Sequence, residues 1–326
     1  MPSMKAIKRR RLTVKNISQI TKAMNLVATS KLQRARTAFA AVSKPVQATF
    51  DIVYNTVNDL DPQAMENFKR PLIQTEREAK NEGKKTVAYV LITSSRGLCG
   101  GYNSAVCKEL NRHAKENNIN AIIVPLGTKG RDYFKRRNAN LIETEMPSDS
   151  PTFADAKVIA DELVRLYEKR ADDGTWLIDE VNIVYTQFHT VLNLEPIVRK
   201  VLPINPDYLR QVVGKDLMSG EKWINLGFFE QPEQAPYSTM KQEIEYEPGI
   251  EEVLRNVVPW YLGMFIHAAL ASSTLCEQAA RMTSMDSATK NAGDIIEKLT
   301  LMFNRQRQSI ITQEITEIVS GANALK

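Results

Sequence analysis

The first fifty residues lack acidic side chains altogether. They carry eleven Lys or Arg, and the first acidic residue is Asp51. The rest of the chain has 32 basic against 38 acidic residues, so the net charge of +5 hides a local excess of positive charge. Such a segment suits a nucleic acid, an anionic membrane or an acidic protein surface, and it is also typical of transit peptides and solvated helix faces. Charge alone leaves these alternatives open.

Cysteine is scarce, and recognisable catalytic motifs are missing. The three cysteines are odd in number and show no CxxC pairing: Cys99, Cys107 and Cys276. A disulfide framework or a zinc site is therefore not expected, and a reducing compartment fits best. The three histidines are scattered, at His113, His189 and His267, and there is no GxSxG motif. The sequence thus predicts neither catalytic residues nor a metal site.

A long, purely apolar run is also missing. Residues 257–276 carry no charge apart from His267, and their length would span a bilayer. Pro259, Gly263 and the polar cluster 272–274 dilute the hydrophobicity of this stretch. We therefore expect no membrane span.

Glycine is absent from residues 3–60, which favours one long helix there. Apolar residues follow a 3-4-3 spacing that places them on one stripe of this helix: Ile17, Ile20, Met24 and Val27. A second long helix is predicted from about residue 250 to residue 322. Its apolar residues recur at similar spacing: Ile295, Leu299, Met302, Ile311, Ile315, Ile318 and Ala322.

These two stretches together predict a coiled coil. At 1.5 Å per residue, each helix would be on the order of 80 to 110 Å long. Narrow stripes on helices of this length are typical of a two-stranded seam, so we predict an antiparallel coiled coil between the two ends of the chain. Ala, Ser and Thr alternate with Leu and Ile along residues 270–293, which indicates close helix packing.

The middle of the chain alternates between strand and helix patterns. Strands are predicted at 85–94, 121–127 and 180–188, and helices at 103–118, 128–138 and 152–173. Residues 181–190 and 195–202 are predicted to form a hairpin or an edge pair. This order favours a small parallel or mixed sheet of Rossmann-like type. The predicted domains are a helix at 1–60, an α/β domain at 61–247 with an irregular excursion near 207–242, and a helix at 248–326.

The glycine-rich turn at residues 96–102, RGLCGGY, follows the first predicted strand and precedes a helix. A phosphate-binding turn needs G-x-G-x-x-G or G-x-x-x-x-G-K-[ST], and this turn matches neither. We interpret it as a tight strand-to-helix turn that packs against another element. A small α/β enzyme with a nucleotide at 94–103, or a basic coiled-coil protein that binds nucleic acid, remain the alternatives.

Four segments resemble the signature segments of the gamma subunit of the F-type ATP synthase, in the same order along the chain. They are QITKAMNLVATSKL (19–32), RGLCGGYN (96–103), LASSTLCEQAARMTSMDSATKNA (270–292) and NRQRQSIITQEITEIVSGANAL (304–325). The resemblance implies that the two terminal helices form a rotor shaft inside a ring of three alpha and three beta subunits. It also implies that the α/β domain meets the epsilon subunit and the c-subunit ring.

The resemblance implies a subunit that is not itself catalytic and binds no cofactor or nucleic acid. Ion-driven rotation of the c ring would turn the shaft and change the nucleotide affinity of the beta subunits. Residues expected to contact the beta subunits are Lys22, Met24, Lys31, Arg281, Arg307, Gln308, Thr312 and Glu314. Because the resemblance begins almost at Met1, we expect no transit peptide and a peripheral protein on the cytoplasmic face of a bacterial plasma membrane.

Overall fold

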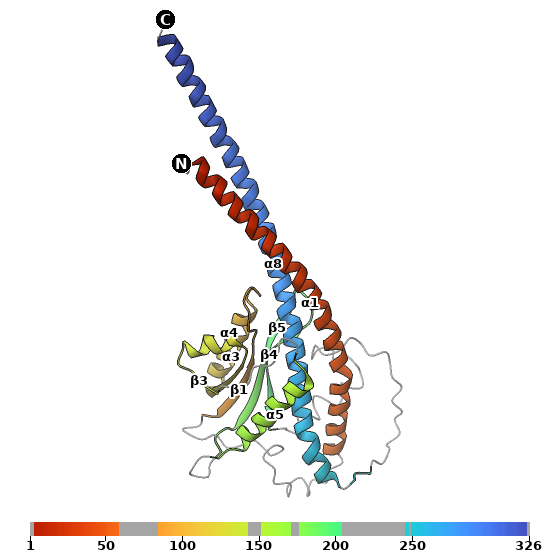
Figure 1. Cartoon of the computed structure of the whole chain (residues 1–326). Coiled ribbons are helices and arrows are strands. Elements are labelled where there is room, and N and C mark those ends of the chain that lie inside the picture. The colour runs from red at the N-terminus through yellow and green to blue at the C-terminus, as the bar shows by residue number, and fades with distance from the viewer. Residues whose placement is uncertain are drawn as a thin grey trace. The chain divides into compact units, whose positions relative to one another are not determined.

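Two long helices, three shorter helices and a five-stranded sheet are found in the described part of the chain (Figure 1). The computed structural model describes residues 3–58, 84–142, 151–170, 176–203, 245–247 and 249–324. The chain divides into two compact units. Unit 1 is formed by residues 1–30 and 281–326, and unit 2 by residues 31–280. The domain boundaries placed at residues 60 and 247 stay a prediction.

Both predicted long helices are confirmed. Helix α1 spans Met4–Asn58 and helix α8 spans Ile250–Ala324, so they contain 55 and 75 residues. Each helix continues through one proline, Pro45 in α1 and Pro259 in α8. Helices this long gain their stability from packing rather than from propensity, so the surface that each one buries decides its role.

The central sheet is of the predicted mixed, Rossmann-like type. Its strands are β1 (Thr86–Ile92), β2 (Asn120–Leu126), β3 (Asn140–Leu141), β4 (Glu180–Phe188) and β5 (Leu194–Leu202). They lie in the order β3-β2-β1-β4-β5. The first four are parallel, and β5 pairs antiparallel with β4 as the predicted hairpin. The α/β fold class is therefore confirmed.

Helices cover both faces of this sheet within unit 2. Helices α3 (Tyr102–Glu116) and α4 (Thr128–Lys135) pack on the face that carries Val87, Tyr89 and Leu91 of β1. Helix α5 (Phe153–Glu168) packs on the opposite face, together with parts of α1 and α8 that belong to unit 2. Alternate residues of each strand thus enter two separate apolar layers.

Helix α5 begins at a capping box and ends earlier than the sequence predicts. The Thr152 hydroxyl accepts a hydrogen bond from the Asp155 amide, and the Asp155 carboxylate accepts one from the Thr152 amide. The prediction extended this helix to residue 173. Instead, Lys169 is extended, and Arg170 forms a β-bridge with Trp176. The two-residue strand β3 was not predicted because it is too short to show a period.

The apolar stretch 257–276 lies in α8 and packs inside unit 2. From residue 257 to residue 280, Trp260 is the only exposed residue. Gly263 faces the Phe153 ring of α5, since a Cβ atom there would lie at van der Waals distance, 3.4 Å, from that ring. In the part of the chain that the structure describes, no helix is both long and apolar enough to cross a membrane. The predicted excursion near 207–242 lies outside the described residues.

Candidate functional site

In unit 1, helix α1 buries a regular seam of mostly small or polar residues. Ile7, Thr21 and Ala28 are buried, and the seam continues between them through the half-buried residues Arg11, Val14, Ser18 and Asn25. These positions alternate in steps of four and three residues, the spacing of a coiled-coil seam. Helix α8 shows the same steps at Met285, Thr289, Ala292, Ile296, Leu299 and Phe303. The predicted two-stranded seam is therefore present in this unit.

Three contacts fix the direction and register of the helix pair. The Asn25 amide donates a hydrogen bond to the Met282 carbonyl at 2.9 Å. The hydroxyls of Thr21 and Thr289 lie 2.8 Å apart, and the Arg11 guanidinium stacks over the Phe303 ring at 5.4 Å from its centroid. Partner numbers fall on α8 as they rise on α1, so the helices are antiparallel. A polar group in such a seam specifies register, because a shifted register would leave it unpaired.

The apolar stripes predicted to form the seam are largely exposed, which corrects that prediction. On α1, Ile17, Ile20 and Val27 are 49%, 59% and 57% exposed. On α8 only Leu299 of the predicted stripe lies in the seam, and the exposed members are Ile295, Met302, Ile311, Ile315 and Ile318. The true seam of α1 lies one residue further along, at Ser18, Thr21, Asn25 and Ala28. The prediction placed the most apolar stripe of each helix in the seam. It was wrong because this unit exposes its larger apolar side chains and buries smaller or polar ones.

Most of the residues predicted to contact a partner are accessible. The exposed ones are Lys22, Lys31, Arg307, Gln308, Thr312 and Glu314, whereas Met24 is half-buried. Arg281 differs because only 9% of it is exposed, so little of its surface is available to a partner.

The structure does not bring these residues into one site. Arg307, Gln308, Thr312 and Glu314 lie within two helical turns near the end of α8. Arg281 precedes Arg307 by 26 residues on the same helix, which corresponds to about 39 Å along the helix axis. The eight predicted contact residues therefore lie at separate positions along the helices rather than in a single pocket, and we call these positions contact stations.

All charged side chains on the outer surface of α1 in unit 1 are basic. Between residues 4 and 30 it carries no acidic residue, and its exposed cations are Lys5, Lys8, Arg9, Arg10, Lys15 and Lys22. The facing part of α8 carries both signs, for example the ion pair in which Lys290 Nζ lies 2.7 Å from Asp286 Oδ2. A surface of one sign attracts an oppositely charged partner over a long range without fixing it in one position.

The glycine-rich turn after β1 is held by side chains of the elements that flank it. The Asn103 side chain accepts a hydrogen bond from the Ser94 amide at 2.9 Å and donates one to the Ser94 hydroxyl at 3.0 Å. Leu98 and Gly100 adopt left-handed backbone conformations, with φ of 67° and 57°. The turn thus curls back on itself before α3 begins.

This turn packs against α8, as the sequence predicted for an architectural turn. Cys99 and Tyr102 form an apolar cluster with Cys276 and Ala280. The Tyr102 hydroxyl donates to the Ser273 carbonyl at 3.2 Å, and burial raises the pKa of this phenol well above its ordinary range. The carboxyl edge of a parallel sheet is where α/β enzymes hold their ligands. Here side chains of α8 occupy part of that edge.

Helix α8 also forms hydrogen bonds with the backbone of β4 near the C-terminal end of that strand. The Thr186 carbonyl accepts hydrogen bonds from the Ser272 hydroxyl at 2.9 Å and from the Cys276 thiol at 3.5 Å. Burial raises the pKa of the Cys276 thiol well above its ordinary value, so this thiol is a poor nucleophile. Within the described ranges, no group of three or more His, Cys, Asp or Glu side chains is arranged to hold a metal ion.

Comparison with known proteins gives a consistent result. The family model described as ATP synthase matches residues 3–325. The chain is 35% identical to the ATP synthase gamma chain of Moorella thermoacetica over 327 residues, which is 100% of both chains. It is 36% identical to that of Ruminiclostridium cellulolyticum over 325 residues, or 99% of each chain.

Solved structures share the fold. A chain of the Euglena gracilis mitochondrial ATP synthase, OSCP/F1/c-ring in rotational state 3, has a TM-score of 0.58 and 16% identity. That match covers 99% of this chain and 94% of the other. A chain of the rotor of the same enzyme in rotational state 1 has a TM-score of 0.55, at 16% identity, and covers 94% of this chain and 98% of the other.

Proposed function

The chain belongs to the ATP synthase gamma-chain family, and we propose that it works as the central rotor shaft of the enzyme. In this role it couples ion-driven rotation of the membrane c-subunit ring to ATP synthesis or hydrolysis at the beta subunits. It is a non-catalytic subunit, because the catalytic sites of the enzyme lie on other subunits. The family assignment agrees with the four sequence segments that resemble the gamma subunit.

The antiparallel helix pair of unit 1 carries this proposal. A shaft that transmits torque must keep its two strands in register, and the Asn25 and Thr21 contacts with α8 supply fixed points along the seam. Close helix packing through small residues such as Ala28 and Ala292 keeps the pair slender. Two helices wound together resist twisting better than one, so this pair suits a rotating element.

The exposed apolar residues of unit 1 support the proposal that other subunits surround the shaft like a sleeve. A monomeric soluble protein rarely leaves many large apolar side chains on one surface, and such surfaces mark contact sites. We propose that a ring of three alpha and three beta subunits covers Ile17, Ile20, Ile315 and Ile318. The basic surface of α1 would attract acidic loops of the beta subunits without locking rotation at one angle.

Within that sleeve, we propose contacts to the beta subunits at the predicted stations. These are Lys22, Met24, Lys31, Arg281, Arg307, Gln308, Thr312 and Glu314. The exposed side chains among them offer charge and hydrogen-bonding groups to a partner, which supports this assignment. The small accessible surface of Arg281 makes it the weakest of the eight.

We further propose that the α/β domain meets the epsilon subunit and the c-subunit ring. The protein would then be peripheral, on the cytoplasmic face of a bacterial plasma membrane. The similarity to gamma chains of the bacteria Moorella thermoacetica and Ruminiclostridium cellulolyticum supports this location.

Reconstitution tests the proposal directly. The purified chain is mixed with alpha and beta subunits, and native mass spectrometry and an ATPase assay follow. We expect one copy to enter a complex with three alpha and three beta subunits, and this complex to hydrolyse ATP. A chain that stays alone, or that binds nucleic acid instead, would overturn the proposal.

A further inference from the structure

Two neighbouring helices of unit 2, α3 and α4, carry a second local excess of positive charge. Residues 102–138 contain eight Lys or Arg and three acidic residues, although the chain after residue 50 is acidic overall. Five of these cations are exposed and form no ion pair with another described residue: Lys108, Lys115, Lys129, Arg136 and Arg137. We call these five residues the α3–α4 basic surface.

The packing of the two helices gathers these cations. Helix α3 follows β1 and α4 follows β2, and these strands are parallel, so both helices begin at the carboxyl edge of the sheet and run in the same direction. They meet where the Asn111 side-chain amide donates to the Tyr133 hydroxyl at 3.4 Å. Cations flank this contact about one helical turn before it and about one turn after it: Lys108 and Lys129, then Lys115 and Arg137.

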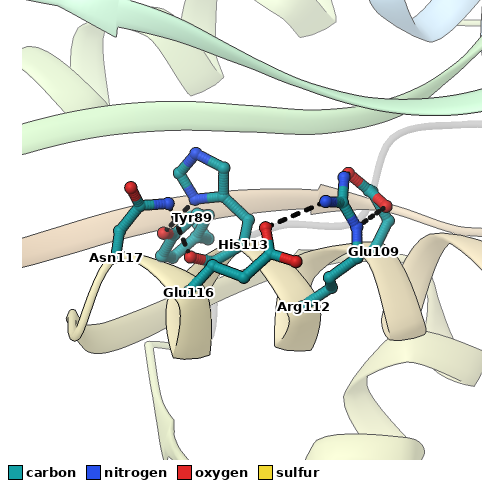
Figure 2. A network of polar contacts seen from close by, with 6 residues as sticks. All are labelled: Tyr89, Glu109, Arg112, His113, Glu116 and Asn117. Carbon is teal, nitrogen blue, oxygen red and sulfur yellow. Dashed lines mark hydrogen bonds and ion pairs between the residues drawn. The ribbon is translucent and has the colours of Figure 1, made fainter.

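The acidic residues of this stretch are already paired with other cations. Arg112 forms ion pairs with both Glu109 and Glu116 on α3, as Figure 2 shows. On α4, Arg131 lies 3.5 Å from a carboxylate oxygen of Asp132. The five cations of the α3–α4 basic surface therefore keep a charge that no described carboxylate compensates.

One of these cations is held in a fixed orientation. The Arg137 guanidinium stacks over the Tyr133 ring at 3.7 Å from its centroid, and its Nη1 donates to the Tyr133 carbonyl at 2.9 Å. A stacked guanidinium is already ordered, so it loses little freedom when its remaining N–H groups bind an anion such as a phosphate.

Helix stability does not explain the whole surface. Cations near the C-terminal end of a helix interact favourably with the helix dipole, which accounts for Lys115 and Arg136. Lys129 lies in the first turn of α4, a turn without acidic residues, where a positive charge is unfavourable for the helix. A partner of opposite charge explains this position.

The composition of the surface indicates which acidic partner fits. The core of a protein interface is rich in aromatic residues and poor in Lys. Here no large apolar side chain is exposed on α3 or α4, and three of the five cations are Lys. An anionic bilayer needs no apolar anchor, because it attracts a cluster of Lys and Arg through its headgroup charges alone.

We propose that the α3–α4 basic surface binds the anionic phospholipid headgroups of a bilayer. This inference rests on the peripheral location at the plasma membrane that is part of the proposed function. Helices α3 and α4 lie on the sheet face opposite to α5, so α5 does not cover them (Figure 1). A fluid layer of headgroups holds the surface near the membrane without fixing an angle, so the contact is compatible with rotation.

Cosedimentation of the full-length chain with vesicles tests this proposal. The exposed cations of α1 in unit 1 would also bind anionic vesicles, so they are replaced by Gln in every sample. We expect binding to phosphatidylcholine vesicles that contain about one third phosphatidylglycerol, and none to phosphatidylcholine alone. Binding should weaken as the salt concentration rises, because salt screens the attraction. Equal binding to both kinds of vesicle would overturn the proposal.

Two triple variants locate the binding surface. Lys115→Gln, Lys129→Gln and Arg136→Gln together should weaken the affinity for anionic vesicles by about a hundredfold, since each cation near such a bilayer contributes about fivefold. The matched control removes three exposed cations on the opposite side of the sheet: Lys157→Gln, Arg165→Gln and Lys169→Gln. This control should bind as tightly as the parent chain. Equal affinities of the two triple variants would contradict the assignment of the surface.

Two further measurements separate the alternatives. Single-stranded DNA and polyglutamate stand for the other classes of acidic partner. Tighter binding of either one than of the vesicles, lost in the first triple variant, would assign the surface to that class instead. Reconstitution with alpha and beta subunits tests the proposed function separately. A chain that assembles into an active complex but binds no anionic vesicles overturns the lipid proposal alone, whereas a chain that binds vesicles and never assembles overturns the proposed function.

Discussion

Two stretches of the same helix, α8, use apolar side chains in opposite ways. Between residues 257 and 280, every residue except Trp260 is buried or half-buried, and Leu262 and Ile266 are completely covered within unit 2. Between residues 311 and 321, every residue is exposed, although several are large and apolar.

The difference shows that hydrophobicity marks a surface to be covered and does not say what covers it. In unit 2 the sheet and its helices cover α8. In unit 1 each helix of the coiled coil covers only a narrow seam of the other. The apolar residues outside that seam stay exposed, which marks them as a contact surface for a partner. A shaft inside a sleeve of other subunits explains this pattern, since its outside is then an interface.

The largest expected effect is a difference in the free energy of unfolding between substitutions in the buried and in the exposed stretch of α8. Leu262→Ala removes a fully buried side chain and leaves a cavity, so we expect the free energy of unfolding to fall by about 3 kcal/mol. Ile318→Ala, at a position that is 71% exposed, should change it by less than about 0.5 kcal/mol. Urea unfolding of the isolated chain measures both. Equal losses in the two variants would remove the distinction drawn between the stretches.

The exposed stretch should matter for activity instead. We expect Arg307→Ala to lower the ATPase rate of the reconstituted complex by about tenfold, comparable to the loss of one strong interface contact. The free energy of unfolding of the isolated chain should stay unchanged within about 0.5 kcal/mol, because Arg307 is exposed. Lys298→Ala, an exposed cation outside the predicted stations, is the control. An unaltered ATPase rate would remove Arg307 from the proposed contacts.

The long elements of this fold could be predicted from the sequence, because a continuous pattern averages out local ambiguity. Both long helices, the strands β1, β2 and β4 and the hairpin follow from periodicity and from the positions of glycine and proline. The C-terminal end of α5 and the two-residue β3 could not be predicted, since neither is fixed by a repeating pattern. A β-bridge between Arg170 and Trp176 follows the C-terminal end of α5.

The seam of unit 1 and the contact between Tyr89 and His113 could not be predicted from the sequence. The steps of four and three through Ile7, Thr21 and Ala28 are present in the sequence, but they join residues of mixed polarity, and the purely apolar stripe beside them is the stronger signal. Tyr89 on β1 and His113 on α3 lie in hydrogen-bond contact, 2.8 Å apart (Figure 2), and only the folded domain brings these two elements together. The contact stations came from the family resemblance, because exposed polar residues on a helix carry no pattern of their own.

A smaller effect tests whether the glycine-rich turn is attached to the buried stretch of α8. Tyr102→Phe keeps the ring and removes the hydroxyl that donates to the Ser273 carbonyl, so we expect a loss of about 1 kcal/mol in the free energy of unfolding. Tyr133→Phe is the control, because its hydroxyl takes part in a longer contact, 3.4 Å from the Asn111 amide. Equal stabilities of Tyr102→Phe and wild type would mean that apolar packing alone holds the turn.

The smallest effect concerns the pH dependence of the buried stretch. Burial lowers the pKa of His267 on α8, while a backbone hydrogen bond with Pro151 and the charge of Asp155 oppose this shift. As the pH falls through about 6.5, the unfolded chain takes up a proton at this position and the folded chain does not. The free energy of unfolding therefore falls with acidification until the lower pKa of the folded state is reached.

We expect His267→Gln to lose part of this acid sensitivity, measured as the difference between urea unfolding at pH 7.5 and at pH 5.5. Comparison at pH 8, where His267 is neutral in both states, isolates the packing cost of the substitution, and an unchanged difference between the two pH values would exclude His267 as a source of the acid sensitivity.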